Sequence, residues 1–242
     1  MEQIWFDGFK LNDFVTILDV QGMGIPQVRS YKTNVIGRNG TVYDSSDLEE
    51  RVVTIECLLR EKKGDLMTLE QKFDRLKAII SPLLGERQLN FDKPTGTRTL
   101  FCRYEGIMDI ENLLRSKRFP LTFVASDPLF YSGSSELMAT GTNITINNDG
   151  TAPSRRWRLN MDPFSGEGEI KATRQPYTLN LAQPSQAKPG TLIINGYEKR
   201  IEQDGKGAHE WYSSGKFFQL ETGIVTISCP TNATLFWRKA YL

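Results

Sequence analysis

The sequence contains few of the side chains on which catalytic and metal sites depend. Its 242 residues include a single histidine, His209, and three cysteines. Zinc ligand pairs are spaced by roughly two to five residues. The two nearest of these four residues, His209 and Cys229, lie 20 positions apart. A Gly-x-Ser-x-Gly nucleophile motif is also lacking. We therefore predict that the chain is not an enzyme and has no catalytic, cofactor-binding or metal-binding residues.

The chain also lacks an excess of charge of one sign and any long apolar run. Thirty Lys and Arg stand against 29 Asp and Glu, for a formal net charge of +1. This balance argues against nucleic-acid recognition and against attraction to a membrane surface. No segment approaches the roughly 20 apolar residues that a bilayer demands, and the N-terminus does not resemble a secretory signal. We expect no membrane anchor, and a protein that folds in the cytosol and stays soluble until it assembles.

Phosphate-binding loops are a third absence. Two glycine pairs occur, in Gly22-Met-Gly24 and Gly37-Arg-Asn-Gly40. Neither opens a helix after a strand, so neither can place a phosphate at a helix N-terminus. Both are predicted to be turns, and no cofactor is expected.

The cysteines are too few and too scattered for a disulfide framework. Cys57, Cys102 and Cys229 lie far apart and are odd in number. Free cysteine is one of the more buried residue types. We predict buried thiols in a protein that folds in a reducing compartment.

What the sequence does contain is mostly short β-strands. The stretch from Arg51 to Leu59 places Val53, Ile55, Cys57 and Leu59 on one face. This two-residue period is typical of a half-buried strand. In the first half, β-rich stretches predict five further strands at 14–19, 28–31, 88–91, 100–103 and 118–125.

Pro120 bears on the position of one of these strands. Proline has no backbone N–H and cannot donate a ladder hydrogen bond. The strand 118–125, which contains Pro120, is therefore predicted to lie at an edge or a bulge.

One segment has the period of a helix. Its apolar residues recur at steps of three and four, at Leu69, Phe73, Leu76 and Ile80. Thr68 and Gln71 fit a capping box, and Gly85 is suited to the C-terminal end. We predict a helix from Thr68 to Leu84, shortened by Pro82, that covers one face of a sheet.

The amino-acid composition changes after Ser126-Asp-Pro-Leu-Phe-Tyr131, since residues 132–142 are mostly small and polar. We predict a domain junction there, marked by Asp127 and Pro128, with domains 1–131 and 132–242. Beyond it, short strands alternate with Asn-Gly and Thr-Gly turns, which indicates an all-β sandwich. The predicted strands are 144–146, 157–161, 177–181, 191–194, 217–220, 224–228 and 234–241.

Three of the four tryptophans, Trp157, Trp211 and Trp237, lie in this second half. Trp157 and Trp237 lie in predicted strands, so they are expected in the core, where large aromatic side chains dominate the buried area. Trp211 lies beside a glycine-rich turn and is a candidate for stacking on a glycan. This supports an alternative function, a carbohydrate-binding module.

The order of these features resembles the distal tail protein (Dit) family of siphophages over essentially the whole chain. The marks of the resemblance are Asn34–Gly40, the strand Arg51–Leu59, the helix Thr68–Leu84, Gln88–Phe91, Arg103–Gly106, Phe119–Tyr131, Asn147–Pro153 and Phe236–Leu242. The Ser-Asp-Pro-Leu-Phe-Tyr junction and the Asn-Asp-Gly-Thr-Ala-Pro opening are the most specific. Leu220-Glu-Thr-Gly223 departs from the family, which often has a proline before this glycine.

The resemblance implies a mainly β protein with an N-terminal, β-rich, ring-forming domain that carries one helix, and a C-terminal galectin-like β-sandwich outside the ring. It implies a structural virion protein at the tail tip, assembled in the host cytoplasm as a homo-hexamer. Its implied partners are the major tail tube protein, the tail-associated hub or lysin and the tape-measure protein, with receptor-binding proteins in some members. The resemblance assigns no residue to the ring interface.

Overall fold

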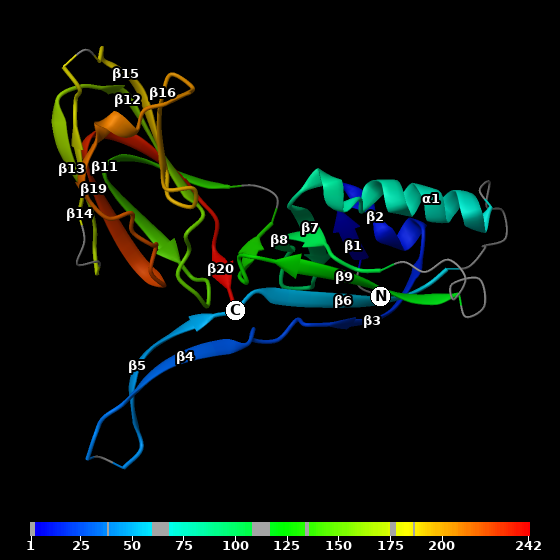
Figure 1. Cartoon of the computed structure of the whole chain (residues 1–242). Coiled ribbons are helices and arrows are strands. Elements are labelled where there is room, and N and C mark those ends of the chain that lie inside the picture. Colours follow the sequence, from blue (N-terminus) through cyan, green and yellow to red (C-terminus); the bar gives the residue numbers. More distant parts are fainter. Residues whose placement is uncertain are drawn as a thin grey trace. The chain divides into compact units, whose positions relative to one another are not determined.

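The computed structural model describes residues 3–37, 39–59, 68–107, 117–133, 136–174, 178–185 and 187–242. The chain divides into two compact units, Met1–Phe130 with Leu242, and Tyr131–Tyr241. The boundary predicted from the sequence lies one position further along. Strands dominate both units, and the described residues contain one α-helix (Figure 1), as expected for the predicted mainly β fold class.

The first unit is built on an antiparallel sheet with the strand order β2-β1-β7-β8-β9-β6-β3. Its strands are β1 (Gln3–Phe6), β2 (Phe9–Lys10), β3 (Thr16–Gln21), β6 (Arg51–Leu58), β7 (Arg87–Asp92), β8 (Arg98–Tyr104) and β9 (Arg118–Ala125). A short 3₁₀ helix, η1 (Leu11–Asp13), follows β2. Two further strands, β4 (Val28–Asn34) and β5 (Thr41–Leu48), form a separate two-stranded sheet.

The alternation in β6 builds the core of this unit. Val53, Ile55 and Cys57 are fully buried, as the two-residue period predicts. Cys57 pairs with Phe119 of β9, and directly opposite residues of an antiparallel pair share a face. The Phe119 ring meets Phe73 of the helix edge-on, with ring centroids 6.4 Å apart. The helix therefore covers this face of the sheet, as predicted.

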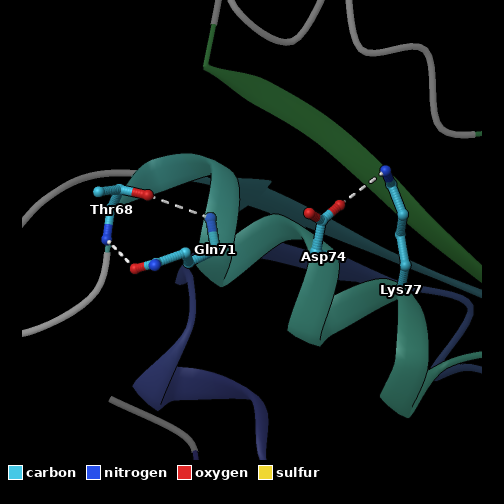
Figure 2. Close-up of polar contacts among 4 residues, drawn as sticks. All are labelled: Thr68, Gln71, Asp74 and Lys77. Atoms are coloured by element: carbon cyan, nitrogen blue, oxygen red, sulfur yellow. Dashed lines mark hydrogen bonds and ion pairs between the residues drawn. The ribbon is translucent and has the colours of Figure 1, made fainter.

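The helix α1 spans Leu69–Ile79 and begins as the capping box predicts. Gln71 N donates to Thr68 Oγ1 over 3.3 Å, and Thr68 N donates to Gln71 Oε1 over 3.0 Å (Figure 2). Further along, Lys77 pairs with Asp74. The helix ends before Leu84, as the shortening by Pro82 predicts. The chain turns at Ser81 into a 3₁₀ helix, η2 (Pro82–Leu84), because Pro82 cannot continue an α-helical ladder, and Gly85 ends η2 instead.

Pro120 lies in an interior strand, which corrects the edge prediction. β9 stands between β8 and β6. Leu59 N donates to Lys117 O, whereas Glu105 N donates to Thr122 O. Backbone groups alternate in direction along a strand, so the nitrogen of Pro120 points away from β6, towards the β8 side. The described β8–β9 pairing covers only Val124 and Phe123 of β9, so proline removes no hydrogen bond from that pairing.

The second unit consists of short and long β-strands that pack around one hydrophobic core. Its strands are β11 (Leu137–Asn148), β12 (Trp157–Phe164), β13 (Glu167–Ala172), β14 (Thr178–Ala182), β15 (Gly190–Asn195), β16 (Arg200–Gln203), β17 (Lys206–Gly207), β18 (Tyr212–Gly215), β19 (Gly223–Trp237) and β20 (Ala240–Tyr241). A 3₁₀ helix, η3 (His209–Trp211), precedes β18. The short strand β10 (Phe130–Ser132) crosses the boundary between the units.

The long strand β19 makes this unit a sandwich. Its end Ala233–Trp237 pairs with β12, while Ile227 and Ser228 pair with β13. β11 follows both parts of β19, and its pairing shifts between Gly141 and Asn143. The irregularity bends both strands, so the sheet folds into two layers with the buried side chains between them. This is the β-sandwich predicted from the strand spacing.

Three predicted strands of the second unit need correction. Residues 217–220 do not form a strand, and only Leu220 makes an isolated bridge, to Ser154. The predicted strands 224–228 and 234–241 are instead the continuous strand β19 followed by β20. Residues 229–233 belong to β19, and they connect its part that pairs with β13 to its part that pairs with β12.

The three cysteines are free and buried, as predicted. Burial raises the pKa of the Cys57 thiol to about 12 and that of Cys229 to about 11, and it also raises the pKa of Cys102. Since the thiolate is the reactive form, we expect none of the three to react with a disulfide reagent such as DTNB in the folded protein at pH 8. In guanidinium chloride all three are expected to react. Fast labelling of any thiol in the folded protein would contradict this.

Candidate assembly surfaces

The strands β4 and β5 form an arm that projects from the first unit (Figure 1). They pair with each other from Val28↔Leu48 to Asn34↔Thr41, with a register shift between Tyr31 and Lys32. Neither belongs to the main sheet. An isolated two-stranded hairpin is at best marginally stable in water, so an arm of this kind needs a covering surface.

The arm exposes an unusual share of apolar side chains. Every residue of β4 is exposed, and β5 is nearly as open. Ile36 at the tip is fully exposed, and Tyr43 is 60% exposed. The exposed large apolar residues of the arm and of its root, residues 22–27, are Ile25, Val28, Tyr31, Val35, Ile36 and Tyr43. A group of this kind marks an interaction site.

Apolar residues lie on both faces of the arm. Residues two apart on a strand share a face, and paired residues do too. By the register, Val28, Leu48 and Tyr43 lie on one face, and Tyr31 and Val42 lie on the other. The arm is thus suited to contact a partner with both faces.

Only part of this arm is predicted from the sequence. The expected elements were a strand at 28–31 and a turn at Gly37–Gly40, with no strand at 41–48. A signal for the second strand was present, since Asn39-Gly40 followed by Thr41-Val-Tyr43 is typical of a hairpin turn leading into a strand. Polar and apolar residues do not alternate regularly there, because neither face of the arm is covered by the residues that the structure describes.

The root of the arm is fixed tightly to β6. Gly22, which has a φ of 85°, lies so close to the β6 backbone that a Cβ would stand 2.0 Å from Val52 O. Glu49 N donates to Gln27 O over 2.8 Å. Arg29 forms an ion pair with Glu49. The glycine cluster predicted as a turn is therefore the bend at which the chain leaves β3 for the arm.

Arg51 is a buried cation of the first unit. Its side chain is 1% exposed, and burial lowers its pKa to about 10, so it remains charged at neutral pH. Nε donates to Pro128 O over 2.6 Å, and Nη1 donates to Gly22 O and Gly24 O. The sequence analysis did not single out this residue, because its partners are backbone oxygens that lie far away along the chain.

The predicted junction residues Asp127 and Pro128 lie within the first unit. Leu129 N donates to Asp127 Oδ1 over 3.4 Å. Pro128 O accepts from Arg51. These residues therefore shape the segment that leads to the boundary at Phe130.

The two most C-terminal marks of the family resemblance meet in the second unit. Asn148 Nδ2 donates to Leu220 O and Glu221 O. Asp149 forms an ion pair with Lys239, with 2.7 Å between Nζ and Oδ1. These contacts join the segments 147–153, 220–223 and 236–242.

Gly150 allows the segment 147–153 to pack closely against the C-terminal strand. A Cβ on Gly150 would stand 2.2 Å from Ala240 O, and Ala152 N donates to that same oxygen. The opening motif therefore holds the C-terminal strand through close backbone contact.

Trp211 does not present a face to solvent, which corrects the predicted stacking position. Its side chain is 1% exposed, and Nε1 donates to Gln203 Oε1 over 3.0 Å. Phe164 packs against the ring, with centroids 5.5 Å apart. The residue ends η3, whose turn carries the ring into the core. Trp157 and Trp237 are also buried, as predicted.

The described residues offer little for metal or nucleophilic chemistry. No group of three or more His, Cys, Asp or Glu side chains that could hold a metal is found among them. His209 is exposed on η3. Within the same ranges, no helix has the length and apolar character that a bilayer-spanning segment needs.

Comparison with known proteins finds a match for part of the first unit and similar folds for the whole chain. The sequence model of the phage tail protein RIFT-related domain matches residues 8–125. A search of curated proteins finds no match. The domain match covers the first unit from β2 to β9, including the arm and its root, and begins after β1.

The whole chain is similar to solved phage structures. The crystal structure of the SPP1 Dit protein (gp 19.1), described as a paradigm of the hub adsorption apparatus in phages that infect Gram-positive bacteria, matches with a TM-score of 0.74 at 17% identity and covers 100% of both chains. A chain of the phage p2 baseplate, activated with Sr, matches with a TM-score of 0.51 at 10% identity over 98% of each chain. A chain of the baseplate activated with Ca gives 0.52 at 10% identity, over 99% of this chain and 98% of that one. Residues 8–125 of the chain therefore match the phage tail protein RIFT-related domain, and over its whole length the chain has the fold of the SPP1 Dit protein.

Proposed function

We propose that six copies of this chain form a ring at the tip of a phage tail, where the ring joins the tail tube to the adhesion apparatus. The family of the first unit and the likeness of the whole chain to the SPP1 Dit protein and to baseplate chains support a structural role in the tail. The role is non-enzymatic. The protein acts by fitting against its own copies and its neighbours in the virion.

The arm is the observation that carries this proposal. A closed ring of more than two copies uses two different surfaces of each copy. An arm with apolar residues on both faces and no cover within the described chain supplies one such surface. Laying the arm on the next copy also buries its strand edges, which would otherwise invite aggregation.

The neighbours of the ring follow from its place in the tail. The tail tube protein lies on one side and the tail-associated hub or lysin on the other, and the tape-measure protein passes through the centre. Where the tail carries receptor-binding proteins, the galectin-like second unit is their attachment point. The location is the virion tail tip.

A charge at the tip of the arm is expected to prevent ring formation. Ile36→Asp removes an apolar side chain that contacts solvent only, so the folded subunit should keep its stability. Multi-angle light scattering should give about six times the 27.5 kDa of one chain for the unmodified protein and a mass near that of one chain for Ile36→Asp. The physical reason is that a buried, unpaired carboxylate costs several kcal/mol at an interface.

Ile224→Asp is the matched control, because Ile224 is also exposed but lies in the second unit. It should leave the ring intact. An unmodified protein that stays monomeric at high concentration would overturn the proposal. The carbohydrate-binding alternative has lost its candidate residue, since Trp211 is buried.

A further inference from the structure

We propose that Arg51 couples the root of the arm to the segment Asp127–Phe130, by which the chain leaves the first unit. A change at one of these places is then transmitted to the other through a single side chain. The family match and the similar structures do not assign this role to any residue.

Arg51 lies between the two segments in the fold although both are distant in sequence. It is the first residue of β6, directly after the arm. On one side, Nη1 donates to Gly22 O and Gly24 O in the arm root. On the other side, Nε donates to Pro128 O over 2.6 Å. One rigid guanidinium plane therefore holds backbone oxygens of both segments.

A second contact joins the segment Asp127–Phe130, called the exit segment below, to the Arg51 guanidinium. The guanidinium carbon of Arg51 lies 4.3 Å from the centroid of the Phe130 ring, within the range of a cation–π interaction. Phe130 is itself buried and meets Phe91 edge-on, with centroids 6.0 Å apart. The exit segment thus contacts Arg51 through a carbonyl and a ring, two residues apart.

The root of the arm cannot absorb a displacement by itself. The backbone of Gly22 rests against Val52, and Gln27 O accepts from Glu49 N. Because Gly22 rests against β6 and Gln27 is bonded to Glu49, two residues before β6, a shift of the arm moves the Gly22 and Gly24 carbonyls together. Arg51 must follow them or lose hydrogen bonds that its buried N–H groups cannot replace with water.

Only arginine suits this position. Its planar group donates in several fixed directions at once, whereas a lysine ammonium is a compact point charge. Arg51→Lys keeps the charge, but one nitrogen cannot reach both the root carbonyls and Pro128 O. This variant therefore cuts the link with the smallest change of size and charge.

What this coupling does in the virion rests on the proposed function. When the arm seats on the next copy of the ring, Arg51 transmits the seating to the segment that leads towards the second unit. Ring assembly would then set the conformation of that segment.

Hydrogen–deuterium exchange on the full chain tests the coupling. Phe130→Leu alters the exit segment, and the exchange of the Glu49 amide, which donates to Gln27 O, reports on the root. We expect Phe130→Leu to raise exchange at the root roughly tenfold, the change that corresponds to about 1.4 kcal/mol of local opening free energy. In the Arg51→Lys chain, which already exchanges faster at both segments, Phe130→Leu should add little at the root.

Arg103→Met is the matched control. Arg103 Nη1 donates to Ser126 Oγ over 3.0 Å, so it contacts the residue before Asp127 but not the arm root, and the root should exchange as in the unmodified protein. The proposal is overturned if Phe130→Leu leaves the root unchanged, or if its effect persists in full in the Arg51→Lys chain. Because both segments lie within one chain, a monomeric protein that shows the coupling would overturn the ring and not this inference.

Discussion

Replacement of Trp211 by alanine is expected to lower the free energy of unfolding of the second unit by about 3–5 kcal/mol, as for other buried Trp-to-Ala changes. The ring is 1% exposed and packs against Phe164. Its removal leaves a cavity that β-strands on both sides cannot close, and it leaves Gln203 Oε1 without its donor. Thermal denaturation followed by circular dichroism should show a fall in Tm of about 10–20 °C for a unit of this size.

Tyr212→Ala is the control for this substitution. Tyr212 is the next residue and is 41% exposed, and its hydroxyl donates to Gly215 O. Its loss should cost at most about 1 kcal/mol. If Trp211→Ala instead left Tm unchanged, the ring would not be part of the core. A carbohydrate-binding role at this residue would then regain its support.

Replacement of Gly22 by alanine is expected to destabilise the first unit by about 2–4 kcal/mol. The backbone at Gly22 has a φ of 85°, which L-residues with a Cβ adopt at a cost. The new Cβ would also stand 2.0 Å from Val52 O, and a backbone oxygen inside a sheet cannot move aside as a flexible side chain can. Urea denaturation should show a lower midpoint.

Gly24→Ala separates local strain from a general effect of removing glycine. Gly24 lies two residues further on, and a Cβ there would meet nothing within 4 Å. Its carbonyl would still accept from Arg51. We expect Gly24→Ala to change stability by less than about 1 kcal/mol. Equal losses for the two variants would show that the close approach at Gly22 has no energetic weight.

Features that depend on neighbouring residues could be read directly from the sequence. Alternation in 51–59 predicted the buried face of β6, and Thr68 with Gln71 predicted the start of α1. Both patterns arise from local geometry, a repeat of two residues in a strand and one turn of a helix. The division near residue 130 and the sandwich of the second half were predicted for a similar reason, since turns and small polar residues are local signals.

Features that depend on distant partners could not be read in this way. Pro120 suggested an edge strand, yet β9 is interior, and only the pairing of β8 shows that the nitrogen faces a side where no ladder bond is lost. The second strand of the arm was not predicted, because the described residues cover neither face of the arm and its sequence therefore does not alternate.

The sequence by itself determined the mainly β class, the single described helix and its capped start, the buried thiols and the scarcity of catalytic side chains. Only the tertiary structure decided that Trp211 is buried, that residues 28–48 stand out as an arm, and that Arg51 joins two segments far apart in the chain. The physical reason is the range of the interactions: period and capping act over a few residues, whereas burial and hydrogen bonds to backbone oxygens depend on which remote strands come together.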